Sequence, residues 1–526
     1  MKLLRHKRDK SPQGQGSEES RAAQPRPLQS SDAPHVPLWA LLLPFVVLTA
    51  LLVCVIRYFG SDALDGASQL ALLFSSGFTA AIAMIFLKVP WERLEEAVRK
   101  NIGSVFSAVL ILFFIGAISG SWMISGVVPT LIYYGLQVLS PGAFLFLACL
   151  ICALVSLMTG SSWTTVATIG IAFEGVGVAL GYSPAWIAGA IISGAYFGDK
   201  MSPLSDTTVL ASSVGGVSLF THIRYMMITT VPSITIALVV FLVVSLTHSA
   251  EGTVQTASFA TGLQQGFVIS PWLLLVPVVT AVLIALRLPA VITLFLSSLV
   301  AGVVALIVQP QVLASIGGGG DFAGIFRGLM ITFFGETSID TGNEVLNNLV
   351  HTHGIHGVLN TVFLIICAAT FGGMLTGSGI LQNLTERLSR HIASRGSLVG
   401  STVAAGLFSN MITGDQYLSI VLTTSLYKRL YAEKGYEGRL LSRTAEDSAT
   451  VTSVLIPWNT CGMTQSMVLK VPTVEYLPYC FFNLISPFMT LCVALVGYKI
   501  HKVAPSHGED DEPDEKKNEK SESKRR

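Results

Sequence analysis

Long apolar segments are the feature that most restricts how this chain can fold. Stretches such as Leu38–Ile56, Gly66–Leu87 and Ser104–Ile124 each offer about the 20 apolar residues that a helix needs to cross a bilayer. Only 12% of the 526 residues are charged, whereas a soluble domain usually has about a quarter, and the mean hydropathy is +0.62. The sequence therefore predicts an all-α polytopic membrane protein with roughly ten to twelve transmembrane helices.

The two ends of the chain differ from the apolar body. Residues 1–36 are polar, basic and rich in Ser, Pro and Gln, and residues 502–526 form a second charged segment. Neither end can bury a core, so we expect two disordered tails, both cytoplasmic because both are rich in Lys and Arg. Between them we expect a first membrane repeat over 37–247, an external linker over 248–270 and a second membrane repeat over 271–501.

Two halves of the chain carry the same features in the same order. Glycines, a Thr-Gly pair and a proline recur at a nearly constant spacing of 253 or 254 positions. Such an ordered series predicts an internal duplication. The matched features are Gly120 and Gly126 with Gly373 and Gly379, Thr159-Gly160 with Thr413-Gly414, and Pro203 with Pro457.

Basic residues in the loops indicate that the second half is inverted. Lys88, Arg93, Arg99 and Lys100 follow the second apolar segment, as expected if the N-terminus is cytoplasmic. Glu174–Tyr182 contains no basic residue, whereas its counterpart region in the second half holds Lys428, Arg429, Lys434 and Arg439. Equivalent loops therefore face opposite sides, which is the charge pattern of an inverted-topology repeat.

Between Asn101 and His222 the chain has only four charged residues, and three of them lie in one short motif, GAYFGDKMSPLSDTT. Asp199, Lys200 and Asp206 lie within eight positions of one another, and charged groups at membrane depth usually mark an ion or proton path. Pro203 disfavours helix at Ser202, so backbone carbonyls become free to bind a hard cation. We predict a Na⁺- and H⁺-binding site with an oxygen-only shell, unsuited to a transition metal, formed by Asp199, Asp206, Ser202, Ser205 and Thr207.

The counterpart motif in the second half, SATVTSVLIPWNTCG, repeats the helix break at Pro457. Asn459 and Thr460 follow this break, and we expect them to complete the shell. Upstream, MTGSSW and ITGDQY are polar interruptions between apolar segments, and each predicts the tip of a re-entrant hairpin. Second-choice site or gating residues are Asp415, Asp447, Lys200, Thr159 and Ser161.

Simpler interpretations exist for several of these charges. Lys200 can neutralise Asp199 or Asp206 in a structural pair, and surface salt bridges with nearby basic loops can explain Asp415 and Asp447. The Cys149-x-x-Cys152 motif lies in the middle of an apolar stretch, where small hydrophobic side chains in a packed helix are the better interpretation. The few histidines near the membrane segments do not indicate a metal site.

The motifs Gly194–Thr208, Thr413–Tyr417 and Glu446–Gly462 resemble those of the NhaC-type sodium/proton antiporters. The similarity extends from about Leu38 to His501 and excludes the polar N-terminal tail. It implies membership of the ion-transporter superfamily, with two re-entrant hairpins and two broken helices around a midplane site. It also implies a transport part that moves against a scaffold, often within a homodimer.

These observations predict a sodium/proton antiporter of the cell inner membrane, exchanging Na⁺ or Li⁺ for H⁺ with Asp199 and Asp206 as the exchanging groups. We expect no enzymatic activity, no cofactor and no nucleic-acid partner; the partners are Na⁺, H⁺ and the lipid bilayer. The main alternative is a Na⁺- or H⁺-coupled exchanger of organic anions such as malate and lactate, or of amino acids. Lys200 and Arg443 are the candidates for binding an anion. A passive cation channel is a further alternative.

Overall fold

The computed structural model describes residues 37–59, 66–247, 253–286, 288–380, 382–383, 392, 394–500 and 502. The predicted N-terminal tail and nearly all of the predicted C-terminal tail lie outside the described residues. Within these ranges the chain is helical, and its extended backbone pairs only in two isolated bridges, Thr337 with Thr352 and Tyr436 with Lys502.

Helices long and apolar enough to cross a membrane number seven in the described part of the chain. Two bent helix pairs raise this number to nine if each pair counts as one span. Short helices such as Asp206–Gly215 and Thr460–Leu469, which follow the two helix breaks, are not part of this count. These seven candidates are α1 (Leu38–Phe59), α2 (Ala67–Ile85), α3 with α4 (Trp91–Ile124), η2 with α6 (Pro141–Thr159), α11 (Leu219–Thr247), α14 (Ala290–Val308) and η5 with α18 (His356–Gly377).

The first half contains a helical hairpin followed by a broken helix. The hairpin consists of α6 (Phe144–Thr159) and a returning arm formed by α7 (Ser162–Thr165), the π-helical turn η3 (Val166–Gly170) and α8 (Ile171–Ala179). The broken helix consists of α9 (Pro184–Met201) and α10 (Asp206–Gly215), which the Pro203 segment separates. Both predicted features of this half are therefore present.

The second half repeats this arrangement at the spacing that the sequence indicates. Its α23 (Thr460–Leu469) begins and ends 254 positions after α10. The Pro457 segment precedes α23 as the Pro203 segment precedes α10. The other elements of this half are the hairpin arms α20 (Arg395–Thr413) and α21 (Gln416–Glu433), then α22 (Gly438–Ala445) with η6 (Glu446–Thr450) and η7 (Ser453–Leu455) before the break.

The two hairpin tips are built alike because their residues have matching roles. Gly160 and Gly414 end α6 and α20 in the left-handed conformation, with φ of 68° and 62°, which a residue without Cβ adopts at little cost. Ser161 and Asp415 then cap the returning arms, accepting hydrogen bonds from the backbone N–H of Thr164 and Leu418. This correspondence is what a duplicated unit requires.

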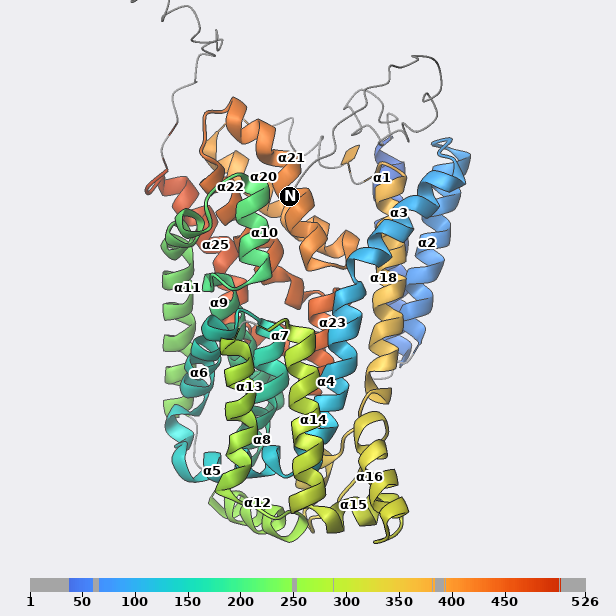
Figure 1. The fold of residues 1–526 in the computed structure, drawn as a ribbon. Helices are drawn as coiled ribbons and strands as arrows, with labels where there is room; N and C mark the ends of the chain where they lie inside the picture. Colours follow the sequence, from blue (N-terminus) through green and yellow to red (C-terminus); the bar gives the residue numbers. More distant parts are fainter. Residues whose placement is uncertain are drawn as a thin grey trace, which may run out of the picture.

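The two halves enter the molecule from opposite sides (Figure 1). The α6–α8 hairpin and α9 occupy the lower part of the view with α10 above them, whereas α20, α21 and α22 occupy the upper part with α23 below. The chain thus ascends through α9 and α10 and descends through α22 and α23. The confirmed fold class is a helical membrane protein with inverted halves, hairpins and broken helices.

The remaining helices cover this centre and connect the halves. Residues 253–266 of the predicted external linker form a helix, α12. The elements are α5 (Val127–Val138), α12 (Thr253–Gly266), η4 (Pro271–Leu274), α13 (Leu275–Ala285), α15 (Pro310–Gly317), α16 (Phe322–Phe334), α17 (Glu344–Val350), α24 (Thr473–Tyr476), η8 (Leu477–Tyr479) and α25 (Phe481–Val496).

Glycines allow α6 and α9 to pack with their backbones in close approach. A Cβ at Gly194 would lie 2.1 Å from the carbonyl oxygen of Cys149, and one at Gly198 would lie 2.3 Å from that of Ala153. Small residues at such contacts let membrane helices gain van der Waals packing. Cys149 and Cys152 are buried free thiols in this packed helix, in keeping with their interpretation as small hydrophobic side chains. The close contact fixes Asp199, at the end of α9, relative to the hairpin tip.

Candidate functional site

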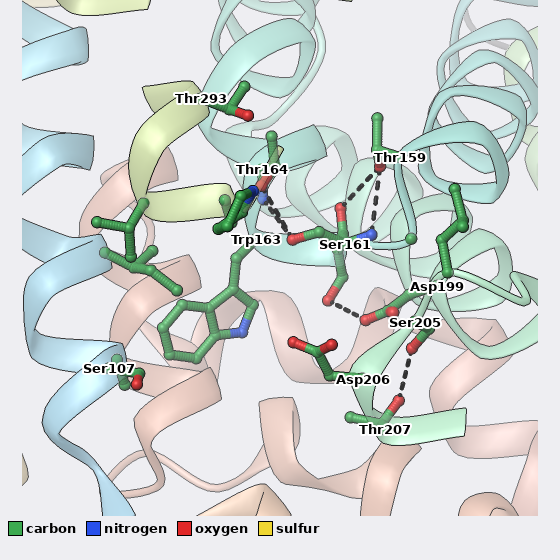
Figure 2. A pocket seen from close by; sticks show the side chains of 18 of the residues that line it. Ser107, Thr159, Ser161, Trp163, Thr164, Asp199, Ser205, Asp206, Thr207 and Thr293 are labelled. Atoms are coloured by element: carbon green, nitrogen blue, oxygen red, sulfur yellow. Dashed lines mark hydrogen bonds between the residues drawn. The ribbon is translucent and has the colours of Figure 1, made fainter. Parts of the chain in front are cut away.

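A cavity of about 610 Å³ opens where the first hairpin tip meets the first helix break (Figure 2). One wall comes from the tip and from the α9–α10 break, and the opposite wall comes from α4 and from the corner between α13 and α14. The first residues of α21 reach it from the second half. Its polar lining consists of Ser104, Ser107, Thr159, Ser161, Ser162, Thr164, Asp199, Ser205, Asp206, Thr207, Thr293, Gln416 and Tyr417.

The two predicted carboxylates face this cavity from the two sides of the break. Asp199 is 7% exposed, and its Oδ2 accepts a 2.8 Å hydrogen bond from the Ser162 hydroxyl of the hairpin tip. Asp206 is the first residue of α10, and its carboxylate points toward the space between the Trp163 ring and Asp199 (Figure 2). Both residues line the same cavity. The structure therefore brings the two residues of our primary prediction together.

Hydroxyl groups surround the break, but they do not all face the cavity. The Ser205 and Thr207 hydroxyls lie 2.9 Å apart, and both residues line the cavity (Figure 2). Ser202 is fully buried and does not line it, and its hydroxyl accepts a 3.2 Å hydrogen bond from the backbone N–H of Leu204. Pro203 itself is exposed, in the segment that separates α9 from α10. The break thus presents Ser205 and Thr207 to the cavity, whereas Ser202 shapes the turn.

Thr159 and Ser161 order the hairpin tip and also line the cavity. The Thr159 hydroxyl accepts a 3.2 Å hydrogen bond from the backbone N–H of Ser161. Ser161 in turn accepts a 3.2 Å hydrogen bond from the backbone N–H of Thr164, at the start of the returning arm. These two second-choice residues therefore hold Ser162 in position beside Asp199.

The second break does not contribute to this cavity. Asn459 caps α23, accepting from the backbone N–H of Cys461 at 3.0 Å, and its amide donates to the Asn410 carbonyl at 3.2 Å. Thr460 donates its backbone N–H to the carbonyl of Gly414, at the second hairpin tip. Asp415 caps α21 and is 1% exposed. The second break and Asp415 therefore lie outside the cavity in buried polar surroundings, and the surface interpretation of Asp415 is wrong.

Lys200 points away from the cavity, although it follows Asp199 directly in the chain. Its amino group pairs with Asp447, and both side chains are 0% exposed. Asp447 also accepts hydrogen bonds from Thr229 at 2.8 Å and from Ser486 at 2.9 Å. Lys200 therefore neutralises neither Asp199 nor Asp206, and the surface interpretation of Asp447 is wrong.

Arg443 and Glu446 lie close to this pair and are likewise fully buried. The Arg443 guanidinium stacks over the Tyr225 ring at 4.6 Å, and its Nε lies 4.0 Å from Asp447 Oδ2. Neither carboxylate oxygen of Glu446 accepts a well-formed hydrogen bond. Neither Arg443 nor Glu446 lines the cavity. The two candidates for binding an anion, Lys200 and Arg443, therefore both make their contacts outside the cavity.

Several residues of the cavity wall were not predicted from the sequence, and four of them, Ser162, Trp163, Gln416 and Tyr417, belong to the two hairpin tips. Trp163 follows Ser162 at the first hairpin tip, and Gln416 and Tyr417 begin the returning arm of the second hairpin. Gln416 and Tyr417 stand 254 positions after Ser162 and Trp163. Applying the repeat spacing to the whole hairpin tip, rather than to its Thr-Gly pair alone, would have identified these four residues as equivalents.

The fold and the site together define the class of protein. Inverted repeats that place hairpin tips and broken helices around a polar cavity at the centre of the molecule are the architecture of secondary transporters. The model of the Na⁺/H⁺ antiporter family matches residues 13–195 and 194–498, and the chain belongs to this family.

Curated relatives include transporters of different substrates. The Na⁺/H⁺ antiporter NhaC of Alkalihalophilus pseudofirmus is 38% identical over 80% of this chain and 89% of that protein. The malate-2H⁺/Na⁺-lactate antiporter of Bacillus subtilis is 34% identical over 82% and 90%, respectively. The arginine/ornithine antiporter ArcD of Halobacterium salinarum is 33% identical over 90% and 95%. The relatives are antiporters, and this chain is a multi-pass membrane protein like them.

Proposed function

We propose that this protein exchanges Na⁺, or Li⁺, for H⁺ across the cytoplasmic membrane, with Asp199 and Asp206 as the exchanging groups. The observation that carries this proposal is the lining of the cavity. The lining residues include two aspartates and, among the described residues, no Lys, Arg or His. A cavity with this charge attracts a cation and disfavours an anion.

The arrangement of oxygens suits a small hard cation. Sodium, like other hard cations, is bound by carboxylate, hydroxyl and carbonyl oxygens. Asp199 and Asp206 supply the negative charge, and Ser205 and Thr207 present hydroxyls beside them. The sequence predicted that Asn459 and Thr460 would complete this shell. Their hydrogen bonds support the second break and tip instead, and we do not include them among the proposed ligands of the ion.

The same carboxylates can couple the cation to protons. Two carboxylates that face the same cavity repel each other when both are ionised, and either a cation or a proton relieves the repulsion. Because the groups interact, they bind protons as a pair rather than as independent sites. A site that holds Na⁺ or H⁺, but not both together, is sufficient for exchange.

The location of the cavity suggests which parts move. One wall belongs to the first hairpin and the broken helix, and the other belongs to α4 and the α13–α14 corner. Displacement of the first wall along the second would carry the carboxylates toward one membrane face or the other. We propose this displacement as the transport step. The homodimer implied by the family resemblance is part of the same proposal.

The distribution of basic residues supports an orientation. The basic helix α3 and the α21–α22 turn lie toward the same end of the molecule (Figure 1). We therefore propose that this end, together with both chain termini, is cytoplasmic.

The test is sodium-dependent proton movement in everted membrane vesicles from cells that lack their own antiporters. After respiration acidifies the lumen, added Na⁺ should restore the fluorescence of a pH-sensitive dye. Asp199→Asn and Asp206→Asn should abolish this response at equal protein abundance. Glu344→Gln, a change of an exposed carboxylate at the start of α17, is the control and should retain it. Exchange that persists in both aspartate variants would refute the site.

A second candidate is exchange of cationic amino acids. The same two carboxylates could bind an ammonium or guanidinium group, and one of the relatives is named as an arginine/ornithine antiporter. Counterflow of labelled arginine in proteoliposomes distinguishes the two functions. Arginine exchange without any response to Na⁺ or Li⁺ would replace our proposal, and labelled malate exchange would indicate an organic-anion carrier instead.

A further inference from the structure

Two histidines and a glutamate meet in the loop between α16 and α18. Glu336 Oε1 lies 2.9 Å from His351 Nε2 and 3.5 Å from His353 Nδ1. The ligand atoms of the three residues all lie within 4.8 Å of one another. This cluster is separate from the cavity, because none of its members lines it.

The backbone of the loop holds the three side chains on one side. Thr337 and Thr352 form an isolated antiparallel bridge, with reciprocal backbone hydrogen bonds of 2.8 and 3.0 Å. Their hydroxyls lie 2.8 Å apart on one face of the bridge. Side chains alternate along extended backbone, so Glu336, His351 and His353 lie on the other face.

Two further contacts fix this loop. The backbone N–H of Ile355 donates to the Phe333 carbonyl at 3.0 Å, which continues the pairing beyond the bridge. Lys470, the residue that ends α23, donates its amino group to the His351 carbonyl at 2.6 Å. The cluster is therefore prearranged by the fold and joined to the helix that follows the second break.

We propose that Glu336, His351 and His353 form a binding site for a divalent transition metal, for which Zn²⁺ is the best-matched ion. Around tetrahedral Zn²⁺ with bonds of about 2.0–2.1 Å, neighbouring ligand atoms lie about 3.4 Å apart. The observed separations of 2.9 and 3.5 Å lie on either side of this value. All three ligand atoms lie within 4.8 Å of one another, and rotation of the side chains is the adjustment that the ion requires.

The ligand chemistry selects a metal other than the transported ion. Imidazole nitrogens suit Zn²⁺ and neighbouring transition metals, whereas Na⁺ and Mg²⁺ prefer sites made of oxygen alone. Three protein ligands leave the fourth position of a tetrahedral ion to water. Water has access because the Glu336 side chain is 62% exposed and the His353 side chain 50%. This site does not depend on the proposed sodium/proton exchange.

Sequence alone did not reveal the cluster, because its members meet only through the Thr337–Thr352 bridge. The His351-x-His353 pair is too short a pattern to indicate a metal, and Glu336 belongs to a stretch that also contains Asp340 and Glu344. In the folded protein only Glu336 of this stretch has its carboxylate beside the imidazoles of both His351 and His353.

The test measures metal binding to the full-length protein, purified in detergent through a tag without histidine. Isothermal titration with Zn²⁺ at pH 7.5 should show one site per chain. His351→Ala and Glu336→Gln should each weaken this binding at least tenfold, and the double variant His351→Ala/His353→Ala should eliminate it. His356→Ala, which alters an exposed histidine of the same loop outside the cluster, should bind Zn²⁺ as the wild type does.

Thermal unfolding separates loss of the site from loss of the fold. Zn²⁺ bound only by the folded protein raises its Tm, so the wild type and His356→Ala should be stabilised and the double variant should not. Without metal, all of these proteins should unfold at the same temperature. Absence of a saturable site in the wild type, or equal binding by the wild type and the double variant, would overturn the proposal. Sodium/proton exchange in vesicles is scored separately, so its presence or absence does not alter this result.

Discussion

Lys200 of the first half and Asp447 of the second form an ion pair that is completely removed from solvent. Thr229 on α11 and Ser486 on α25 donate hydrogen bonds to the same carboxylate. The pair thus joins α9, η6 and two flanking helices at one point. Consecutive residues on α9 have different tasks, since Asp199 faces the cavity and Lys200 binds the inverted half.

Removing one member of this pair should destabilise the protein strongly. A buried charge left without its partner costs on the order of 3–5 kcal/mol. Asp447→Asn should cost more than Lys200→Met, because Arg443 Nε lies 4.0 Å from Asp447 and can partly replace the lysine. The double variant should be more stable than Asp447→Asn alone. Unfolding of purified protein, followed by near-UV circular dichroism, measures these differences.

A surface pair provides the comparison. Arg429 and Glu433 pair on α21 with side chains that are 87% and 53% exposed. Glu433→Gln should change stability by less than about 1 kcal/mol, since exposed ion pairs contribute little. If Asp447→Asn is no more destabilising than Glu433→Gln, the buried pair does not stabilise the contact between the halves.

Ser162→Ala should weaken the response to Na⁺ without abolishing exchange. The Ser162 hydroxyl donates the 2.8 Å hydrogen bond that orients Asp199 from the hairpin tip. A hydrogen bond to a charged group contributes about 1.5–3 kcal/mol. If about half of this energy serves cation binding, the Na⁺ concentration for half-maximal dequenching should rise about 3- to 13-fold.

The conservative variant tests whether Ser162 acts through its hydroxyl. Ser162→Thr retains a donor and should restore most of the apparent affinity for Na⁺. An unchanged Na⁺ dependence in Ser162→Ala at every pH would mean that the hydrogen bond does not position Asp199 for binding. Equal loss in the alanine and threonine variants would point to packing at the hairpin tip instead.

Sequence patterns predicted the parts of the site that are local in the chain. The break at Pro203 and the carboxylates beside it are all encoded within one motif, so Asp199 and Asp206 could be predicted to lie together. The pairing of Lys200 with Asp447 could not be predicted, because no local pattern shows which side of α9 faces the other half. Asn459 has the same position after its proline that Ser205 has, yet it caps a helix away from the cavity.

The repeat explains why the backbone elements of the second half could be predicted from the first, whereas the position of Asn459 relative to the cavity could not. Helix bounds and capping roles recur at 254 positions, because backbone geometry follows from the matched Gly, Pro and capping residues. Side-chain chemistry does not recur, since Asp199 and Asp206 correspond to Ser453 and Thr460. In this duplicated fold with unequal side chains, the first half provides the carboxylates of the cavity.

Gly160→Ala should abolish exchange while the protein still inserts in the membrane. Gly160 has φ of 68°, and a Cβ there would lie 2.7 Å from the backbone carbonyl carbon of Leu204 in the α9–α10 break. The methyl group would push the hairpin tip away from the break and separate Ser162 from Asp199. Gly318→Ala is a matched control, since Gly318 has φ of 81° but nothing within 4 Å of a Cβ.

The two glycine variants carry the same left-handed strain, about 1–2 kcal/mol, so they differ in the steric contact. Vesicle assays corrected for protein abundance by immunoblot should show exchange in Gly318→Ala and none in Gly160→Ala. Equal exchange activity in the two variants would show that exchange does not require close contact between the first hairpin tip and the α9–α10 break.

The Zn²⁺ affinity of the Glu336–His351–His353 cluster should depend on pH in a defined direction. Partial burial, followed by the charge of His351, holds the pKa of His353 below its ordinary value of about 6.5, although the charge of Glu336 acts in the opposite direction. His353 is therefore neutral at pH 7–8, and no proton must leave it when the metal binds there. As the pH falls through this lowered pKa, protons compete with Zn²⁺ and the affinity decreases. Titrations with Zn²⁺ between pH 5.5 and 8 should show weak pH dependence above 7 and a decline at the acid end. An affinity that increases on acidification would exclude His353 as a ligand.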